Sequence, residues 1–229
     1  MKIRFYIDPI CPWCWITSRW MTQVATQRDL EIEFCSFSLA AKNDVLDDTS
    51  EDGYGPAARM THGLLRVIEK IKQDCGEQAN DLVAKFYTEI GKRLHVESSK
   101  NTDWLVDVLV EIGLDKTYAK AENDKSYDIA IKKSIELALE TVGDDVGVPI
   151  MILETPEGDR GFFGPVISEL PTMQDSLKLY DGISTMISLN AFYELKRTRE
   201  VGPDVQSTAL LFPDTSSEIS GEGDACPIF

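Results

Sequence analysis

Two cysteines separated by two residues follow a short β-forming segment near the start of the chain. Residues 2–8, KIRFYID, alternate apolar and polar side chains and are rich in β-forming residues, which predicts a strand. From Pro12 to about residue 27 the apolar residues recur at helical spacing. Proline suits the first turn of a helix, because the N–H that it lacks would have no partner there. Cys11 and Cys14 therefore lie where a strand passes into a helix.

The segments that follow define the order of the secondary structure. Residues 30–39, LEIEFCSFSL, alternate again and predict a second strand. Two strands joined by one helix favour a parallel pair with a right-handed crossover. The polar segment 40–53 is expected to be a loop, and residues 56–142 a long helical region that ends at Gly143.

The alternating pattern returns in the last third of the chain. VPIMILE and RGFFG flank the turn residues TPEGD and predict a β-hairpin, followed by helices at about 168–180 and 183–198. The order β-α-β, helices, β-β-α predicts an α/β, thioredoxin-like fold with an all-helical insertion. We expect 1–40 and 143–199 to form the thioredoxin-like domain and 54–142 to form the helical insertion, or cap, domain.

Charge and composition exclude several classes of partner. At 229 residues and a formal net charge of −16, the chain would be repelled by nucleic acids and by anionic membrane surfaces. It has no apolar run near the ~20 residues that a membrane span needs. The first strand begins at once, without space for a signal peptide, so we expect a cytoplasmic location. Residues 200–229 contain six acidic and no basic side chains, which predicts an acidic, flexible tail.

The pair Cys11 and Cys14 could be a redox centre, half of a zinc site or an accident of spacing. Structural disulfides are disfavoured in a reducing compartment, and Cys35, Cys75 and Cys226 supply no second C-x-x-C for zinc, so we predict no metal site. At a helix start, backbone N–H groups favour a negative sulfur and lower the pKa of the Cys11 thiol. Cys11 is therefore predicted to be the nucleophile and Cys14, one turn inward, the resolving thiol.

A distant proline supports the redox interpretation. Val148 and Pro149 stand at the start of a predicted strand, where proline cannot continue a central ladder. After a C-x-x-C helix and before a hairpin, we expect the bond between them to be cis. The backbone of Val148 would then be free to pair with an extended substrate beside Cys11.

Several segments together resemble a known family. DPICPWCWITSRW, SLAAKN, VGDDVGVPIMIL, FFGPV and FYELKRTR are similar to the DsbA-like branch of the thioredoxin superfamily. Within that branch they resemble most closely the cytoplasmic actinobacterial members, which are described as mycothiol-dependent oxidoreductases or nitroreductases. The resemblance runs from the first strand to about Arg199.

The resemblance implies an enzyme and a set of site residues. Cys11 would attack a disulfide or mixed disulfide and Cys14 would resolve it, with mycothiol or a similar low-molecular-weight thiol as co-substrate and no tightly bound cofactor. The cap would move between redox states. His95 matches a histidine of the family's cap, although a solvated histidine at a helix end is an equal alternative. The expected substrate-binding residues are Pro12, Trp13, Asn43, His95, Val148 and Pro149.

Two other functions stay open. One is a glutathione-transferase-like or isomerase-like enzyme of the same superfamily that uses a bound thiol as cofactor; such relatives commonly lack the second cysteine, so Cys14 counts against it. The other is a binding module whose apolar cleft holds a peptide while the thiols are incidental. The physiological substrate, the direction of electron flow and the oligomeric state do not follow from the sequence.

Overall fold

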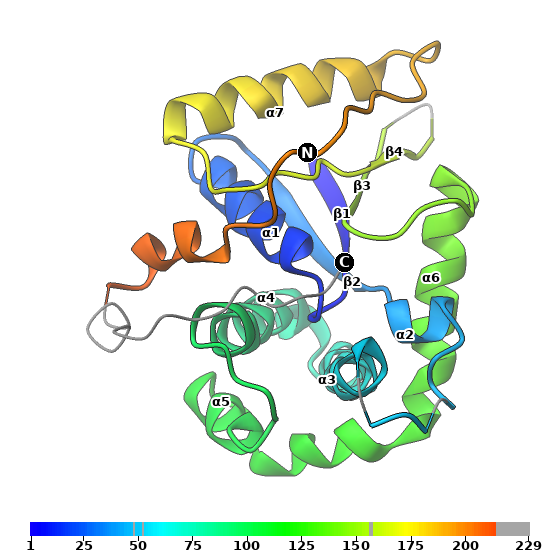
Figure 1. Ribbon diagram of the computed structural model, residues 1–229, viewed down its shortest axis with the longest axis vertical. Coiled ribbons are helices and arrows are strands. Elements are labelled where there is room, and N and C mark those ends of the chain that lie inside the picture. The colour runs from blue at the N-terminus through cyan, green and yellow to red at the C-terminus, as the bar shows by residue number, and fades with distance from the viewer. Residues whose placement is uncertain (48, 52, 156–157, 214–229) are drawn as a thin grey trace.

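A four-stranded mixed sheet lies at the centre of the molecule (Figure 1). The structure is a computed structural model that describes residues 1–47, 49–51, 53–155 and 158–213. The strand order is β2-β1-β3-β4. The strands are β1 (Lys2–Ile7), β2 (Glu31–Ser36), β3 (Ile150–Leu153) and β4 (Arg160–Phe163).

The register of the sheet brings the two halves of the chain together. β1 pairs in parallel with β2, so that Phe5 lies opposite Phe34. On its other side β1 pairs antiparallel with β3, where Tyr6 lies opposite Ile150. The end of β1 and the beginning of β3 therefore meet at one edge of the sheet, which places Cys11 beside Val148. The predicted β-α-β unit and the β3–β4 hairpin are confirmed.

Helices account for most of the remaining described chain. In this part of the chain no helix is both long and apolar enough to cross a membrane. The α-helices are α1 (Pro12–Ala25), α2 (Leu39–Lys42), α3 (Tyr54–Asp74), α4 (Ala79–Gly91), α5 (Leu105–Glu111), α6 (Asp128–Val142) and α7 (Met173–Ser188). Shorter helical turns are η1 (Gly76–Gln78), the π-helical η2 (Lys92–Val96), η3 (Lys116–Asn123), η4 (Lys125–Tyr127) and η5 (Val205–Leu211).

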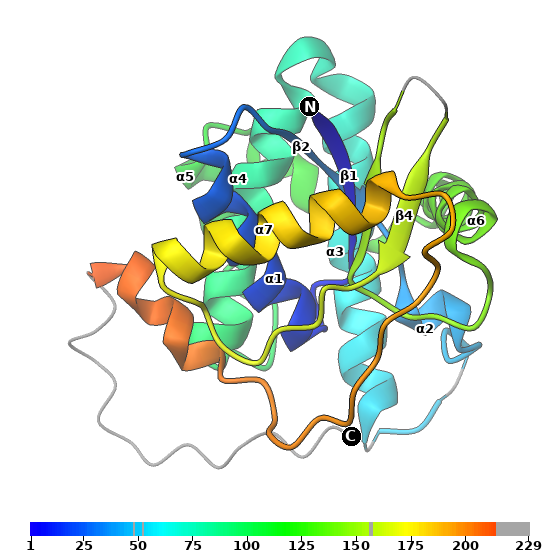
Figure 2. The same ribbon diagram turned by 90° about the horizontal axis from the view of Figure 1, so that it is seen from above.

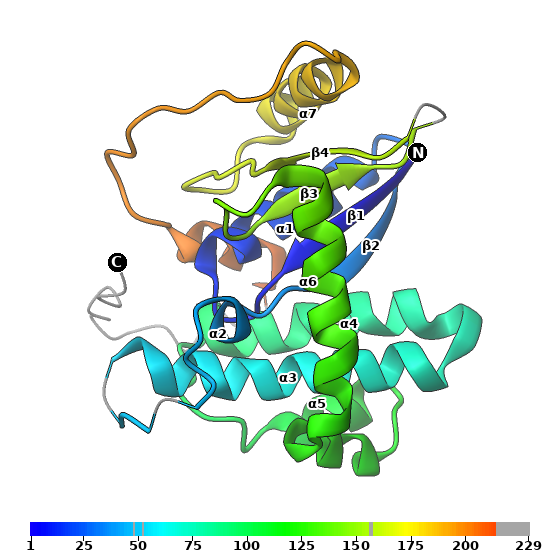
Figure 3. The same cartoon turned by 90° about the vertical axis from the view of Figure 1, so that its right-hand side faces the viewer.

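The helices are arranged in layers around the sheet. α1 packs against α7 on one side, and α6 packs against β2, β3 and β4 on the other (Figure 1). α3 and α4 run side by side below the sheet, next to α5 (Figure 3). Gly143 ends α6 as expected, with a φ of 85° that favours glycine. This architecture is the predicted thioredoxin-like fold with a helical insertion.

Two local predictions were wrong. The expected loop at 40–53 overlaps α2, because Ser38 caps this short helix by accepting a hydrogen bond from the N–H of Ala41. Instead of two helices at about 168–180 and 183–198, one helix spans Met173–Ser188. Gly182 does not interrupt it, because the position faces open space while Tyr180, Ile183 and Ile187 continue one buried face.

The segment after α7 also differs from its prediction. Residues 205–211 form η5, and Thr208 within it is fully buried. The expected flexible tail from residue 200 is therefore wrong for η5, because its side chains find partners on α1. Residues 214–229, including Cys226, lie outside the described residues.

Candidate active site

Cys11 is the N-cap residue of α1. Its backbone is extended, with φ −81° and ψ 111°, and Pro12 occupies the first helical turn. The backbone N–H of Cys14 donates to Cys11 Sγ at 3.4 Å. Free N–H groups and the positive end of the helix dipole both lie at a helix N-terminus. The Cys11 sulfur is therefore placed where a negative charge is stabilised.

Val148, which follows Cys11 by 137 residues in the sequence, lies next to the same sulfur. The Cys11 thiol donates a hydrogen bond to the carbonyl oxygen of Val148 at a sulfur–oxygen distance of 3.6 Å. The peptide bond between Val148 and Pro149 is cis, as is that between Gly164 and Pro165. Cys11, Val148 and Pro149 thus lie together, as the sequence predicted.

Cys14 lies deeper than Cys11. Its side chain is fully buried, whereas Cys11 is 4% exposed. Burial, followed by a hydrogen bond with Cys11, raises the pKa of Cys14 well above that of an ordinary thiol. The two thiols are thus in hydrogen-bonding contact, and the raised pKa favours the protonated form of Cys14. Cys35 is a separate thiol in β2, where burial raises its pKa to about 12.

Of the other expected site residues, Trp13 and His95 contact the segment around Cys11, whereas Asn43 does not. Trp13 is 6% exposed and stands between Pro12 and Cys14 in the first turn of α1. Asn43 is exposed at the end of α2, and within the described residues no hydrogen bond joins it to Cys11 or Val148. His95 is half-buried in η2 and contacts the loop before Cys11, because its Nε2 lies 2.9 Å from the carbonyl oxygen of Pro9.

Asp8 fixes the loop that carries Cys11. This fully buried carboxylate accepts hydrogen bonds from the N–H groups of Ile10 and Leu39 and from the Thr61 hydroxyl. It therefore ties β1 to the start of α2 and to α3. Burial raises the pKa of Asp8 to about 6, despite these donors. The negative charge of Asp8 is also a minor cause of the raised Cys14 pKa.

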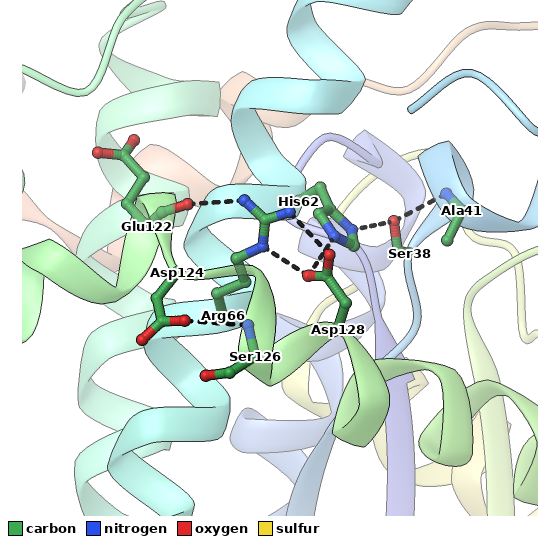
Figure 4. Close-up of polar contacts among 8 residues, drawn as sticks. All are labelled: Ser38, Ala41, His62, Arg66, Glu122, Asp124, Ser126 and Asp128. Carbon is green, nitrogen blue, oxygen red and sulfur yellow. Dashed lines mark hydrogen bonds and ion pairs between the residues drawn. The ribbon is translucent and has the colours of Figure 1, made fainter. Parts of the chain in front are cut away.

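A buried polar network, not foreseen from the sequence, extends this connection to α6 (Figure 4). The Ser38 hydroxyl lies 2.8 Å from His62 Nδ1, and His62 Nε2 lies 3.0 Å from Asp128 Oδ1. Arg66 holds both oxygens of Asp128 and also donates to the carbonyl oxygen of Glu122. The order Ser, His, Asp is that of a hydrolase triad, but Ser38 is fully buried and accepts from Ala41, so the network is structural.

Loss of His62 is expected to destabilise the fold. His62→Leu leaves the Ser38 hydroxyl without its acceptor and should lower the free energy of unfolding by about 2 kcal/mol. Urea titration of the reduced protein measures this difference. Lys132→Ala is the control, because its 3.9 Å pair with Glu136 on α6 is exposed and should change stability by less than about 0.5 kcal/mol. Equal stability of wild type and His62→Leu would contradict a stabilising role for the network.

The second tryptophan of α1 is enclosed by the C-terminal segment. The indole N–H of Trp15 donates to Thr208 Oγ1 at 2.9 Å, and Phe212 stacks on the ring at 5.9 Å between centroids. His95 stacks on it at 5.8 Å. These contacts hold η5 against α1, next to the turn that carries the cysteines.

The thiols have no cluster of metal ligands around them in the part of the chain that the structure describes. Within the described residues, nowhere do three or more His, Cys, Asp or Glu side chains gather so that they could hold a metal ion.

Comparison with known structures shows which fold the chain has. The chain is similar to the probable DsbA oxidoreductase SCO1869 from Streptomyces coelicolor, with a TM-score of 0.54 and 17% identity over 89% of this chain and 97% of that one. It is also similar to the cytosolic disulfide reductase DsbM from Pseudomonas aeruginosa, with a TM-score of 0.51 and 14% identity over 81% and 99% of the two chains. The fold is thus that of DsbA-like thioredoxin-superfamily proteins.

Sequence comparison then gives the family. The model of the Rv2466c-like family, described as mycothiol-dependent nitroreductase Rv2466c, matches residues 10–197. The chain belongs to this family and is an oxidoreductase. A curated relative, the uncharacterized protein Rv2286c of Mycobacterium tuberculosis, is 26% identical over 204 residues, which cover 86% of this chain and 82% of the relative.

Proposed function

We propose that this protein is a thiol-disulfide oxidoreductase that cycles Cys11 and Cys14 between dithiol and disulfide with mycothiol as co-substrate. The observation that carries the proposal is the position of Cys11 Sγ, which caps α1, accepts the Cys14 N–H and lies 3.6 Å from the Val148 carbonyl oxygen. The N-capping sulfur, a second thiol in contact with it and the backbone carbonyl of Val148 are together in one place.

The first step is attack by the outer sulfur. The Cys11 thiolate, stabilised by the N-terminus of α1, attacks a disulfide RS–SR′, forms Cys11–S–SR and releases R′S⁻, which takes up a proton from water. The backbone of Val148 lies next to the new bond and can pair with an extended group on the substrate. Pro12 holds the turn, and Trp13 supplies a rigid apolar surface beside the sulfur.

The second step uses the inner sulfur. Cys14 loses its proton and attacks Cys11 Sγ, which forms the Cys11–Cys14 disulfide and releases RSH. Two molecules of a low-molecular-weight thiol then restore the dithiol and are themselves oxidised to a disulfide. The family description supports mycothiol as this thiol. The structural relative DsbM has also been solved with glutathione, a thiol of the same kind. A cytoplasmic location, where such thiols are abundant, belongs to the same proposal.

Trapping of the mixed disulfide tests the proposal. Cys14→Ser should lose mycothiol-dependent reduction of bis(2-hydroxyethyl) disulfide and accumulate a mixed disulfide on Cys11, which mass spectrometry detects as one added thiol. Cys11→Ser should lose both turnover and the adduct, and Cys35→Ser, which changes a thiol outside the site, should retain both. Full turnover by Cys11→Ser would overturn the proposal.

The same variants test the two alternatives. An isomerase-like enzyme that binds a thiol as cofactor would keep its activity in Cys14→Ser and would not accumulate the adduct. A peptide-binding module would bind its peptide equally well with either cysteine replaced.

A further inference from the structure

A cationic side chain from the C-terminal part of the chain lies over the turn that carries the cysteines. The guanidinium carbon of Arg199 is 5.2 Å from the centre of the Trp13 ring. Arg199 belongs to the coil between α7 and η5, which returns past the N-terminal end of α1 (Figure 2). It follows the last residue of the family match, residue 197.

Contacts on both sides of Arg199 fix the course of this coil. Before it, Phe192 packs edge-to-face on Phe162 of β4, with ring centres 5.4 Å apart. After it, the N–H of Asp204 donates to the carbonyl oxygen of Ser168 at 2.7 Å. Thr208 and Phe212 then attach η5 to Trp15. Because the coil is held at both ends, Arg199 is presented at the site by the fold.

Two hydrogen-bond donors at the turn that carries the cysteines have no acceptor among the described residues. The indole N–H of Trp13 is buried and unpaired. Within the part of the chain that the structure describes, the only recorded contact of Arg199 is with the Trp13 ring. Among the other arginines of the described chain, Arg4, Arg28, Arg66 and Arg93 each pair with a carboxylate, whereas Arg197, in the same coil as Arg199, has no recorded carboxylate partner.

Arg199 lies over an aromatic ring in a chain that is rich in carboxylates. Acidic residues outnumber basic ones, 39 to 23, so an arginine has many potential partners. Arg199 is exposed and lies instead over an aromatic ring next to a nucleophilic sulfur. A guanidinium without a partner is a strong donor to carboxylates. The positive charge of Arg199 also offsets the electrostatic repulsion between an anionic substrate and the Cys11 thiolate.

We propose that Arg199 is a substrate-binding residue that holds a carboxylate of the disulfide that Cys11 attacks. The inference rests on Cys11 being the nucleophile of the proposed function. The inference names a substrate class, carboxylate-bearing disulfides, and assigns the selection of that class to a side chain two positions beyond residue 197, where the match to the family model ends.

Alkylation of Cys11 with two reagents of similar size and different charge tests this role. Iodoacetate carries a carboxylate and iodoacetamide a neutral amide, and peptide mass spectrometry measures the rate at Cys11 apart from the other thiols. Arg199→Ala should slow iodoacetate about fivefold, the effect of one nearby unit charge in water, and leave iodoacetamide unchanged. Arg199→Lys should retain most of the iodoacetate rate, and addition of salt to about 0.5 M should reduce the difference.

Arg197→Ala is the matched control, because it removes the same charge from the same coil without a recorded contact to Trp13. Equal slowing of both reagents in Arg199→Ala, or equal effects of Arg197→Ala and Arg199→Ala on iodoacetate, would overturn the proposal. The two alkylation rates do not depend on turnover. If the wild type showed no turnover while its Cys11 alkylation rate still depended on Arg199 and on the charge of the reagent, only the proposed function would be overturned.

Turnover kinetics provide the substrate-level test. Arg199→Ala should raise KM for glutathione disulfide, which carries carboxylates, about fivefold, with little change in KM for the neutral bis(2-hydroxyethyl) disulfide. A parallel rise in both KM values would overturn carboxylate recognition.

Discussion

Replacement of Trp15 by alanine is expected to lower the free energy of unfolding by about 3–5 kcal/mol, the usual cost of deleting a fully buried large aromatic side chain. Trp15 has no exposed surface. It also donates the hydrogen bond that holds Thr208, so the variant loses both packing and a polar contact that attaches η5.

The surroundings of Trp15 cannot collapse to fill the space. The ring is in contact with side chains from α1, α4, η2 and the segment after η5: Arg19, Tyr87, His95 and Phe212. Gly91 also approaches closely, because a Cβ at that position would lie 2.3 Å from the ring. Since these elements are fixed by other contacts, most of the cavity should remain and the loss should be near the upper end of the range.

Two measurements separate the packing loss from release of the C-terminal segment. Urea unfolding gives the stability difference, and limited proteolysis reports whether cleavage between residues 199 and 213 becomes faster. Leu210→Ala is the control in the same segment, because Leu210 is 87% exposed and its loss should cost less than about 0.5 kcal/mol. A Trp15→Ala protein with wild-type stability and wild-type cleavage would show that the C-terminal segment is not held by this ring.

The features that the sequence predicted correctly are indicated by residues that lie close together in the chain. The helix after Cys11 is indicated by Pro12 and by apolar spacing, and the hairpin by two alternating segments around turn residues. Gly143 marks the end of α6 because its backbone adopts a positive φ. The pairing of Cys11 with Val148 and Pro149 followed from the order of elements, since a thioredoxin-like order brings the first helix and the third strand to one edge.

The features that sequence missed depend on partners far apart in the chain. No local pattern predicts the hydrogen-bond partner of Trp15, because Thr208 is 193 residues away in the sequence. His62 was not assigned a partner, because no local pattern connects it with Ser38 and Asp128. η5 lies in an acidic sequence that predicts disorder, and contacts with distant residues hold it, such as those of Thr208 with Trp15 of α1 and of Gln206 with Val96 of η2.

Asp8→Asn is expected to change how stability depends on pH. The Asp8 pKa is raised by burial from 3.8 to about 6, so the folded protein keeps this proton over a range in which the unfolded chain has lost it. The folded state therefore binds more protons, and the Asp8 contribution to stability falls as pH rises from about 4 to about 6. A shift of this size corresponds to about 3 kcal/mol. An asparagine side chain does not titrate in this range, so the Asp8→Asn variant should lack this fall.

Comparison of the wild type with the Asp8→Asn variant separates the effect of Asp8 from that of the other titrating groups. Burial lowers the pKa of His95 to about 4, so the unfolded chain binds a proton first as pH falls, and His95 produces a slope of the opposite sign. His95 is present in both proteins, so its contribution cancels in the difference. The difference, wild type minus Asp8→Asn, should fall by about 3 kcal/mol between about pH 4 and about pH 7.

At acid pH the same variant reports the hydrogen bonds of Asp8. The two carboxyl oxygens receive three donors there, from Ile10, Leu39 and Thr61. Near pH ~4 folded Asp8 is protonated, but both oxygens of a neutral carboxyl still have lone pairs that accept, whereas the amide nitrogen of asparagine only donates, so the variant should be less stable than wild type by about 1–3 kcal/mol. The gap should close or reverse as wild-type Asp8 ionises. Urea titrations of the reduced proteins at half-unit pH intervals measure both effects, with exposed Asp145→Asn as control. Parallel stability curves for wild type and Asp8→Asn would mean that Asp8 does not ionise between these pH values in the folded protein.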